Sequence, residues 1–277
     1  MKHNVFGWAA AVAVSLAGVG AASAADMAVK ARPVPVAVYS WTGCYIGVSG
    51  GGKWARAEES VVIPAAGLFG QTAVGYTTEP STWLVGGQAG CNMQSGNWVF
   101  GVEADAHAQR WSSLYTLGAG FPAPFVTGDQ YGLSSDWQAS VRGRVGYAMD
   151  RTLFYVTGGV AFTEIQSYTN WIPGVFGGIA FPGTIAYDRQ IAFGGTVGAG
   201  IEYAWTNNFT VGVEGRYTWY GTERLAAGPL ATTAIGVNGA APAFITSNTY
   251  RDVRLETAEV LVKANWKFGP GAVVAKY

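Results

Sequence analysis

Residues 209–220 alternate between apolar and polar or glycine positions, and this alternation constrains the fold more than any other feature of the sequence. A period of two places the two kinds of residue on opposite faces of a β-strand. The apolar face of this segment consists of Phe209, Val211, Val213, Tyr217 and Trp219. The same alternation predicts seven more strands, at 43–55, 83–94, 98–110, 134–149, 153–166, 190–205 and 253–268. In the last of these, Leu261 is an apolar residue on the polar face, which is the wrong parity.

The predicted connections alternate between two lengths. Turn-forming residues at 95–97, 150–151 and 206–208 give short connections. The other connections, at about 56–81, 111–132, 167–187 and 221–249, each have twenty or more residues, which is unusual in a compact soluble domain. An even strand number with short turns at one end and long loops at the other is typical of a bacterial outer-membrane barrel. We therefore predict an all-β fold, an eight-stranded antiparallel up-and-down transmembrane β-barrel with short periplasmic turns and four long extracellular loops.

A soluble, lipocalin-like barrel with its apolar face inside is the alternative, and the aromatic residues argue against it. Amphipathic rings gather at the two boundaries between lipid and water. Trp137 and Tyr147 are ten residues apart, or about 24 Å of barrel height at a tilt of ~45°, which matches an apolar band of ~25 Å. The predicted girdles consist of Trp98, Tyr147, Phe154, Trp205, Phe209 and Trp266 beside the short turns, and of Trp54, Trp83, Trp111, Trp137 and Trp219 beside the long loops.

The charge content favours a wall that faces lipid. Only 12% of the residues are charged, about half the share in a typical soluble domain. The 17 basic and 17 acidic residues leave no basic excess to neutralise phosphates, so that no nucleic-acid partner is expected. The 14% of aromatic residues argue against intrinsic disorder.

Polar residues on the opposite parity are expected to face the interior of the barrel. Eight strands enclose a space that side chains can fill, and buried charges are tolerated when they are paired and hydrogen-bonded. A charge network that fills the lumen is the favoured interpretation, and an ion-conducting path lined by the same residues is the alternative. Glu103 or Asp105 is expected beside Arg142 or Arg144, and Glu214 beside Lys263. The full predicted set contains the acids Glu103, Asp105, Asp136, Glu202, Glu214 and Glu259 and the bases Arg142, Arg144, Arg216, Lys263 and Lys267.

The N-terminal segment indicates export. A short basic start, an apolar run and a small-x-small pattern predict a signal peptide at 1–24, followed by a Pro-containing periplasmic linker at 25–40. The barrel is expected at 41–269 and a tail at 270–277. Cys44 and Cys91 are the only cysteines, and an oxidising compartment favours a disulfide between them if the strand register places them opposite each other.

Several short runs resemble one family. The runs ASAAD at 22–26, WTGCYIG at 41–47, GGQAGCN at 86–92, WVFGVEAD at 98–105 and NWKFG at 265–269 are similar to those of small outer-membrane β-barrel proteins of alphaproteobacteria, the rhizobial porin-like and surface-antigen group. The resemblance implies an outer-membrane location, insertion by the barrel-assembly machinery, and a structural or surface-exposed role. Outer-membrane lipid and lipopolysaccharide are the expected surroundings, and the oligomeric state is open. Either Phe268 or Tyr277 would serve as the terminal aromatic of the assembly signal.

Few residues offer catalytic or binding chemistry. His107, Asp105 and Glu103 could form a catalytic or metal cluster, but their i, i+2 spacing places them on the lumen face of one strand, which favours an interior polar ladder. No enzymatic activity, metal or cofactor is expected. Loop tyrosines that could ligate haem iron are Tyr76, Tyr115, Tyr131 and Tyr168.

The sequence leaves three hypotheses for the function. The leading hypothesis is a structural outer-membrane barrel whose loops present a surface at the cell envelope. A narrow passive porin for small solutes or ions is the first alternative, and a surface receptor for a ligand such as haem, or an outer-membrane enzyme, is the second.

Overall fold

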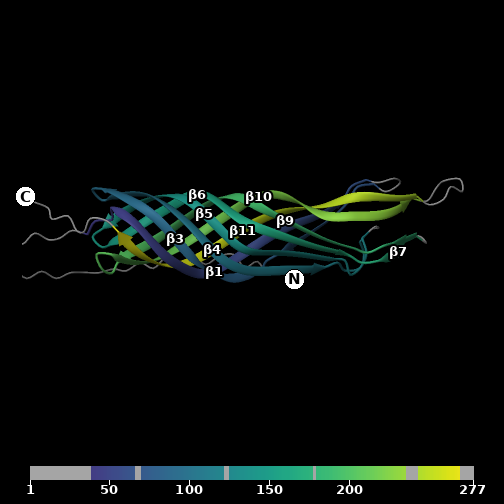
Figure 1. Cartoon of the computed structure of the whole chain (residues 1–277), viewed down its shortest axis with the longest axis horizontal. Helices are drawn as coiled ribbons and strands as arrows, with labels where there is room; N and C mark the ends of the chain where they lie inside the picture. The colour runs from purple at the N-terminus through teal and green to yellow at the C-terminus, as the bar shows by residue number, and fades with distance from the viewer. Residues whose placement is uncertain (1–38, 66–69, 122–124, 177–178, 235–242, 269–277) are drawn as a thin grey trace, which may run out of the picture. The chain divides into compact units, whose positions relative to one another are not determined.

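The computed structural model describes residues 39–65, 70–121, 125–176, 179–234 and 243–268. Within them, antiparallel strands form one sheet that closes into a barrel because its first and last strands pair (Figure 1). This confirms the predicted eight-stranded up-and-down fold. The predicted signal peptide, the linker up to residue 38 and the tail at 270–277 lie outside the described residues. The ring contains, in order, β1 (Gly43–Ile63), β3 (Ser81–Ser95), β4 (Trp98–Thr116), β5 (Gln130–Met149), β6 (Thr152–Trp171), β9 (Thr184–Ala204), β10 (Phe209–Ala234) and β11 (Ala243–Phe268).

Three short strands lie outside this ring. Strand β2 (Thr72–Thr78) pairs with the end of β1, and Glu79 and Pro80 separate it from β3. Proline has no N–H to donate to a strand ladder, which explains the interruption. Strands β7 (Gly174–Phe176) and β8 (Ile179–Phe181) form a small hairpin. Helices of the length and hydropathy needed to cross a membrane do not occur among the described residues.

The short turns have the backbone conformations that tight hairpins need. Ser95 pairs with Trp98, and Met149 pairs with Thr152, so that two residues form each turn. Gly96 has a φ of 60° and Asp150 a φ of 51°. Two-residue hairpins favour glycine, asparagine and aspartate because these residues tolerate positive φ.

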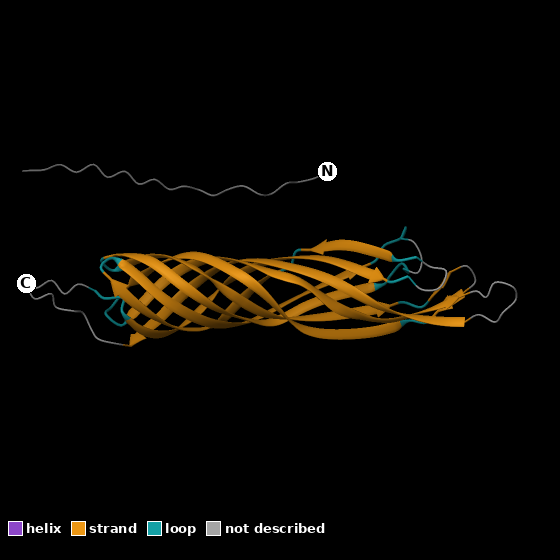
Figure 2. Cartoon of the chain, turned by 90° about the horizontal axis from the view of Figure 1, so that it is seen from above, coloured by secondary structure: helices purple, strands orange, loops and turns teal. Residues whose placement is uncertain are grey.

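The strands extend well beyond the predicted boundaries. The segments that the sequence analysis treats as long loops are largely β-structure, and Figure 2 shows the strands continuing past the barrel toward one end. We call this part the outer sleeve and define it as residues 56–63, 72–78, 110–116, 130–136, 164–171, 184–189, 221–234 and 243–256.

The outer sleeve was missed because its polarity is reversed. In β11, Lys263 and Glu259 point inward in the barrel, whereas Val253 and Leu255 are the inward residues where the sleeve begins. An apolar side chain therefore marks the outside of the barrel and the inside of the sleeve. The sequence prediction placed apolar residues on the lipid-facing side of each strand. The predicted strands therefore stop where the apolar residues change to the inner side.

β-bulges occur where the barrel meets the sleeve. The pairing shifts register between Ala108 and Trp111, between Ser134 and Gln138, and between Trp219 and Thr222. An extra residue in one strand changes which side chains point inward. One prediction is wrong for this reason: Asp136 is exposed on the outer wall instead of facing the lumen. A second is wrong because Trp111 has the same parity on β4 as Glu103 and Asp105, so that it is buried inside instead of belonging to a girdle.

Candidate functional site

The outer wall of the barrel carries a band of apolar side chains between two levels of aromatic residues. Outward positions such as Val48, Val102 and Val213 are exposed, and no outward position of the eight strands carries a charge between the two levels. The sequence-predicted girdle residues Trp54, Trp83, Trp98, Trp137, Tyr147, Trp205, Trp219 and Trp266 are exposed on this wall, and Phe209 is half-buried opposite Trp266.

Charged side chains appear on the outer wall directly beyond the upper aromatic level. Arg56 follows Trp54 by two residues, and Arg110 follows Ala108. Such a boundary is expected where hydrocarbon ends and water begins, because a charge within the lipid face of a barrel is destabilising. The residues at this boundary are Arg56, Arg110, Asp136, Glu164, Arg189 and Glu256.

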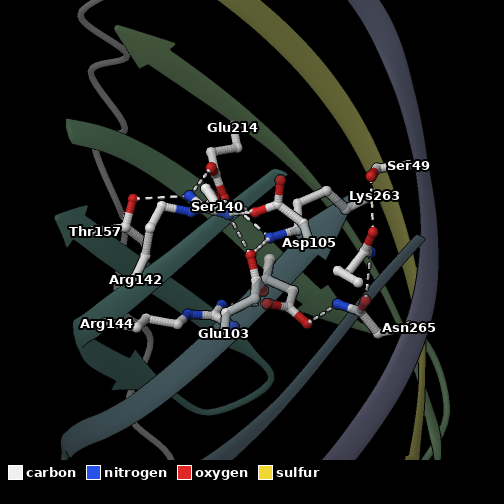
Figure 3. A network of polar contacts seen from close by, with 12 residues as sticks. Ser49, Glu103, Asp105, Ser140, Arg142, Arg144, Thr157, Glu214, Lys263 and Asn265 are labelled. Atoms are coloured by element: carbon white, nitrogen blue, oxygen red, sulfur yellow. Dashed lines mark hydrogen bonds and ion pairs between the residues drawn. The ribbon is translucent and has the colours of Figure 1, made fainter. Parts of the chain in front are cut away.

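Arg142 lies at the centre of the lumen network and contacts three carboxylates (Figure 3). Its Nη2 atom lies 2.6 Å from Glu103 and 2.9 Å from Asp105, and its Nη1 atom donates to Glu214. Lys263 lies 2.6 Å from Glu103 and 3.0 Å from Glu214. The structure thus brings together strands from opposite sides of the barrel through paired charges, and each side chain is buried.

A second layer lies nearer the end of the barrel that has the short turns. The Arg144 guanidinium pairs with Glu202 and stacks 3.8 Å from the ring centre of Tyr155. Tyr45 donates a hydrogen bond of 2.6 Å to Glu103. The aromatic rings of this layer were not predicted as lumen residues, because their strands alternate only weakly in sequence.

A third layer lies nearer the outer sleeve. Arg216 lies 3.0 Å from Asp105 and 3.7 Å from Glu259. Lys53 lies 3.5 Å from Glu259 and donates to Gln138. Lys53 was missed because the glycines at 50–52 obscure the alternation of β1. With Lys53 added and Asp136 removed, five carboxylates face five cations in these three layers, and Lys267 lies apart from them.

The mouth of the barrel at the short-turn end is filled by aromatic residues that precede β1. Trp41 is 1% exposed and packs with Tyr39 against Val99 and Leu153. Lys267 lies 4.4 Å from the ring centre of Tyr39 and donates to the Ser40 carbonyl. The last residues before the first strand therefore close the bore from below.

The interior of the outer sleeve contains two apolar clusters with one buried ion pair. Arg251 and Glu59 are 3.2 Å apart, and Tyr76 donates a 3.0 Å hydrogen bond to Glu59. Burial raises the pKa of the Glu59 carboxyl, although Arg251 and the Tyr76 hydroxyl oppose the shift. Burial also raises the pKa of Asp129, which accepts hydrogen bonds from two backbone N–H groups. The clusters contain Trp111, Leu133, Ile165, Leu225, Val253 and Leu255 on one side of the pair, and Val61, Val74, Leu117, Tyr131, Trp171 and Leu230 on the other.

His107 joins a serine and an aspartate inside the lumen. Its Nε2 atom lies 2.8 Å from the Ser49 Oγ atom, and its Nδ1 atom lies 3.2 Å from Asp105 without the alignment of a hydrogen bond. Ser49 was not singled out in the sequence. The three side chains have the composition of a hydrolase triad, but all are buried, and Ser49 donates to Gln88. Among the described residues no group of three or more metal-ligand side chains has the geometry to hold a metal ion.

The tyrosines considered as haem ligands lie on strands, not in loops. Tyr76 stacks on Tyr115 with ring centres 4.2 Å apart, and Tyr131 packs inside the sleeve. Tyr168 lies on the outer wall beside Tyr187. Tyr76, Tyr115 and Tyr131 therefore pack together inside the sleeve, with the ring centres of Tyr76 and Tyr131 5.9 Å apart, and Tyr168 alone faces outward.

Cys44 and Cys91 form a disulfide that links β1 to β3. The two residues are direct partners in the ladder, and both lie on the outer wall near the short-turn end. The strand register therefore places the two cysteines opposite each other, as the expected disulfide requires.

A wall suited to lipid on the outside and a bore filled with paired charges are the attributes of an integral β-barrel of the Gram-negative outer membrane. Within that class, residues 11–268 match the family described as the outer membrane protein beta-barrel domain, and the chain belongs to this family. The location in the outer membrane follows from this membership and from the outer-membrane relatives of the chain.

The relatives are alphaproteobacterial proteins. The chain is 29% identical over 207 residues to the 25 kDa outer-membrane immunogenic protein of Brucella abortus biovar 1, covering 73% of this chain and 78% of the relative. It is 32% identical over 219 residues to the 31 kDa outer-membrane immunogenic protein of Brucella melitensis biotype 1, covering 74% and 83%. It is 31% identical over 181 residues to the 22 kDa outer membrane protein of Rhizobium leguminosarum bv. viciae, covering 65% of each chain.

Solved structures similar to this chain include the outer membrane protein OprG from Pseudomonas aeruginosa. The identity is 14%, the TM-score is 0.46, and the match covers 83% of this chain and 97% of that one.

Proposed function

We propose that this protein is a closed structural barrel that holds a rigid β-walled sleeve above the outer membrane, where the sleeve presents a surface at the cell envelope. The observation that carries the proposal is the succession of buried layers along the bore. Trp41 fills the periplasmic mouth, Arg142 and its carboxylates fill the middle, and the apolar clusters fill the sleeve. Ions would have to displace paired charges and then cross an apolar zone.

The buried layers also argue against the alternative of a passive porin. Each charge at the centre has partners within hydrogen-bond distance, so that few are free to exchange with a passing ion. A conducting pore keeps water in contact with such groups. Here Glu103 and Arg142 are each 1% exposed.

A planar-bilayer measurement tests the closed state. Refolded protein should give no steady single-channel steps, and heat-modifiable migration on gels should show that the inserted protein is folded. The Trp41→Ala variant should also be silent, because the charge layers and the sleeve remain filled. Steady conductance steps from the folded wild-type protein would overturn the proposal in favour of a porin.

Surface labelling of intact cells tests the orientation. A cysteine introduced at Glu58, in the outer sleeve, should react with a membrane-impermeant maleimide, because Glu58 is 50% exposed on its wall. The matched control is Asn207→Cys in a short turn, which should react only after the outer membrane is opened. Both variants keep the native disulfide, so the added thiol is the only reactive one. Equal labelling of the two sites in intact cells would contradict the proposal.

The proposal includes a non-enzymatic role and insertion by the barrel-assembly machinery. Ser49 has 5% of its surface exposed, which leaves no approach for a substrate. A fluorophosphonate probe should therefore leave Ser49 unmodified in the folded protein, and stoichiometric labelling that His107→Ala abolishes would instead indicate a hydrolase. Depletion of the assembly machinery should leave the protein unfolded in the periplasm.

A further inference from the structure

The outer sleeve carries a row of residues that are neighbours across four strands. Leu114 on β4 pairs with Gly132 on β5, Gly132 pairs with Tyr168 on β6, and Tyr168 pairs with Tyr187 on β9. The side chains of this row lie on the outer wall: Tyr187 is 75% exposed and Leu114 60% exposed. The row is far apart in sequence but continuous in space, so that no single segment reveals it.

The two tyrosines form an aromatic platform. Their ring centres are 5.3 Å apart and their planes are tilted by 46°. Tyr168 leans over Gly132, where an added Cβ atom would approach its Cβ atom to 3.2 Å and its Cδ1 atom to 3.3 Å. Glycine at this position therefore lets the Tyr168 side chain lie close against the wall, and Gly132 is buried beneath it.

Hydroxyl and amide side chains border the platform on both sides. The next register toward the membrane pairs Ser112 with Ser134, Ser134 with Gln166, and Gln166 with Arg189. The register on the other side pairs Thr116 with Gln130, Gln130 with Asn170, and Asn170 with Ile185. Arg189 is the one ionised side chain in these two rows, and it lies 3.4 Å from Glu164.

This arrangement matches the chemistry of a sugar. A pyranose ring has an apolar C–H face that packs on an aromatic ring and a rim of hydroxyls that amides and hydroxyls can bond in either direction. An acidic or basic peptide would need more charge than these rows supply. Gln166 donates to Asp136 and Glu164, and Asn170 donates to Gln130. A hydrocarbon chain would take these polar side chains out of water without offering them a hydrogen bond.

The height of the platform above the membrane identifies the source of the sugar. Tyr187 is six residues beyond Phe193, an outward residue at the upper aromatic level. That spacing corresponds to about 14 Å along the barrel axis at a ~45° tilt. Phospholipid headgroups extend only about 5–7 Å beyond the hydrocarbon, so that the platform lies above them. The platform faces sideways, toward molecules anchored in the same leaflet.

We infer that the row Leu114–Gly132–Tyr168–Tyr187 is a binding platform for the core oligosaccharide of the lipopolysaccharide that surrounds the barrel. The inference extends the proposed function by giving the sleeve wall a ligand. It requires only that the sleeve stands outside the membrane, which the surface labelling tests separately.

Calorimetric titration of detergent-solubilised, folded protein with lipid-free core oligosaccharide tests the inference. Wild-type protein should bind, and Tyr187→Ala should weaken binding about fivefold to tenfold, because an aromatic contact is lost. Tyr187→Phe should bind nearly as well as wild type, since the ring and not its hydroxyl makes the stack. Tyr203→Ala is the matched control: Tyr203 is 46% exposed at the opposite end of the barrel, and its loss should change nothing.

A measurement without substitutions supports the same test. Selective irradiation of aromatic protons in the wild-type protein should transfer saturation to ring C–H protons of the oligosaccharide in NMR spectra. Absence of binding, equal binding by wild type and Tyr187→Ala, or equal weakening by Tyr203→Ala would overturn the inference. Tighter binding of sialylated or sulfated host-type glycans than of the core oligosaccharide would overturn the assignment of the sugar to lipopolysaccharide. A dimer that is lost in Tyr187→Ala would overturn the inference by assigning the platform to a second copy of the chain.

Discussion

Arg251 on β11 reaches across the bore and donates a 2.8 Å hydrogen bond to the carbonyl of Gly132 on β5. These strands are four apart in either direction around the ring, so that the side chain spans the full width of the sleeve. Between the two apolar clusters, Arg251 and Glu59 form a polar crosspiece. The outer sleeve is therefore held together across its interior as well as around its wall.

Loss of this crosspiece should loosen the sleeve more than the barrel. Arg251→Met leaves the Glu59 carboxylate buried without its cation, which should cost about 3 kcal/mol. Hydrogen exchange should accelerate at 57–63 and 130–133, while amides near Arg142 keep their protection. The double variant Arg251→Met/Glu59→Gln should recover much of the loss, and Arg224→Ala, which removes a cation from the exposed face, should have little effect. Uniform acceleration along the chain would contradict a local role.

The sleeve should become less stable as the pH rises. Burial raises the pKa of Glu59 above its ordinary value of 4.5. A carboxyl with a raised pKa contributes stability that is complete below the ordinary value and is lost as the pH rises through the raised value. Hydrogen exchange at 57–63, corrected for the intrinsic pH dependence, should therefore show more frequent opening above the raised value. Glu59→Gln should flatten that dependence, and an unchanged slope in this variant would assign it to another group, with Asp129 the first to examine.

Removal of the central lumen cation should destabilise the whole barrel. Arg142→Met removes the cation that Glu103, Asp105 and Glu214 share and leaves only Lys263 and Arg216 beside these three buried carboxylates, with an expected cost of about 3–5 kcal/mol. The temperature at which the folded band converts to the unfolded band on gels should fall. Adding Glu214→Gln should restore part of the loss. The control is Arg110→Met, a cation whose side chain is 92% exposed, and a fall of equal size there would mean that the network adds nothing specific.

The disulfide should act mainly on the unfolded chain. Cys44 and Cys91 close a segment with a sequence separation of 47, and such a loop is expected to contribute about 2–4 kcal/mol. The variant Cys44→Ser/Cys91→Ser should unfold at lower urea concentration while its folded form keeps the same circular dichroism. An altered folded-state spectrum would show instead that the bond shapes the native wall.

Sequence alternation was sufficient to predict the membrane-spanning part of the fold. Phe209–Tyr220 and Ser134–Met149 alternate strongly because one face of each strand contacts lipid and the other faces the paired charges of the lumen. The period of two is therefore visible in the sequence alone. The neighbours Arg142 and Glu103 could be placed together by counting from the short turns, because those turns set the register.

The residues that the sequence did not reveal have local physical reasons. A bulge next to Trp137 turns Asp136 outward, and no residue pattern announces it. Lys53 follows three glycines, whose missing side chains hide the alternation. The Tyr168–Tyr187 platform depends on pairing between β6 and β9, which only the closed register provides.

The reversal of polarity between barrel and sleeve fixes the height of the protein in the membrane. Sinking by two residues would carry Arg56, Arg110, Arg189 and their acidic neighbours into hydrocarbon, at a cost that grows with depth to about 2–4 kcal/mol per basic residue. Rising would bring apolar wall out of lipid. The chain therefore has one favoured depth, and anything displayed on the sleeve stands at a constant distance from the lipid surface, even where the thickness of the bilayer varies.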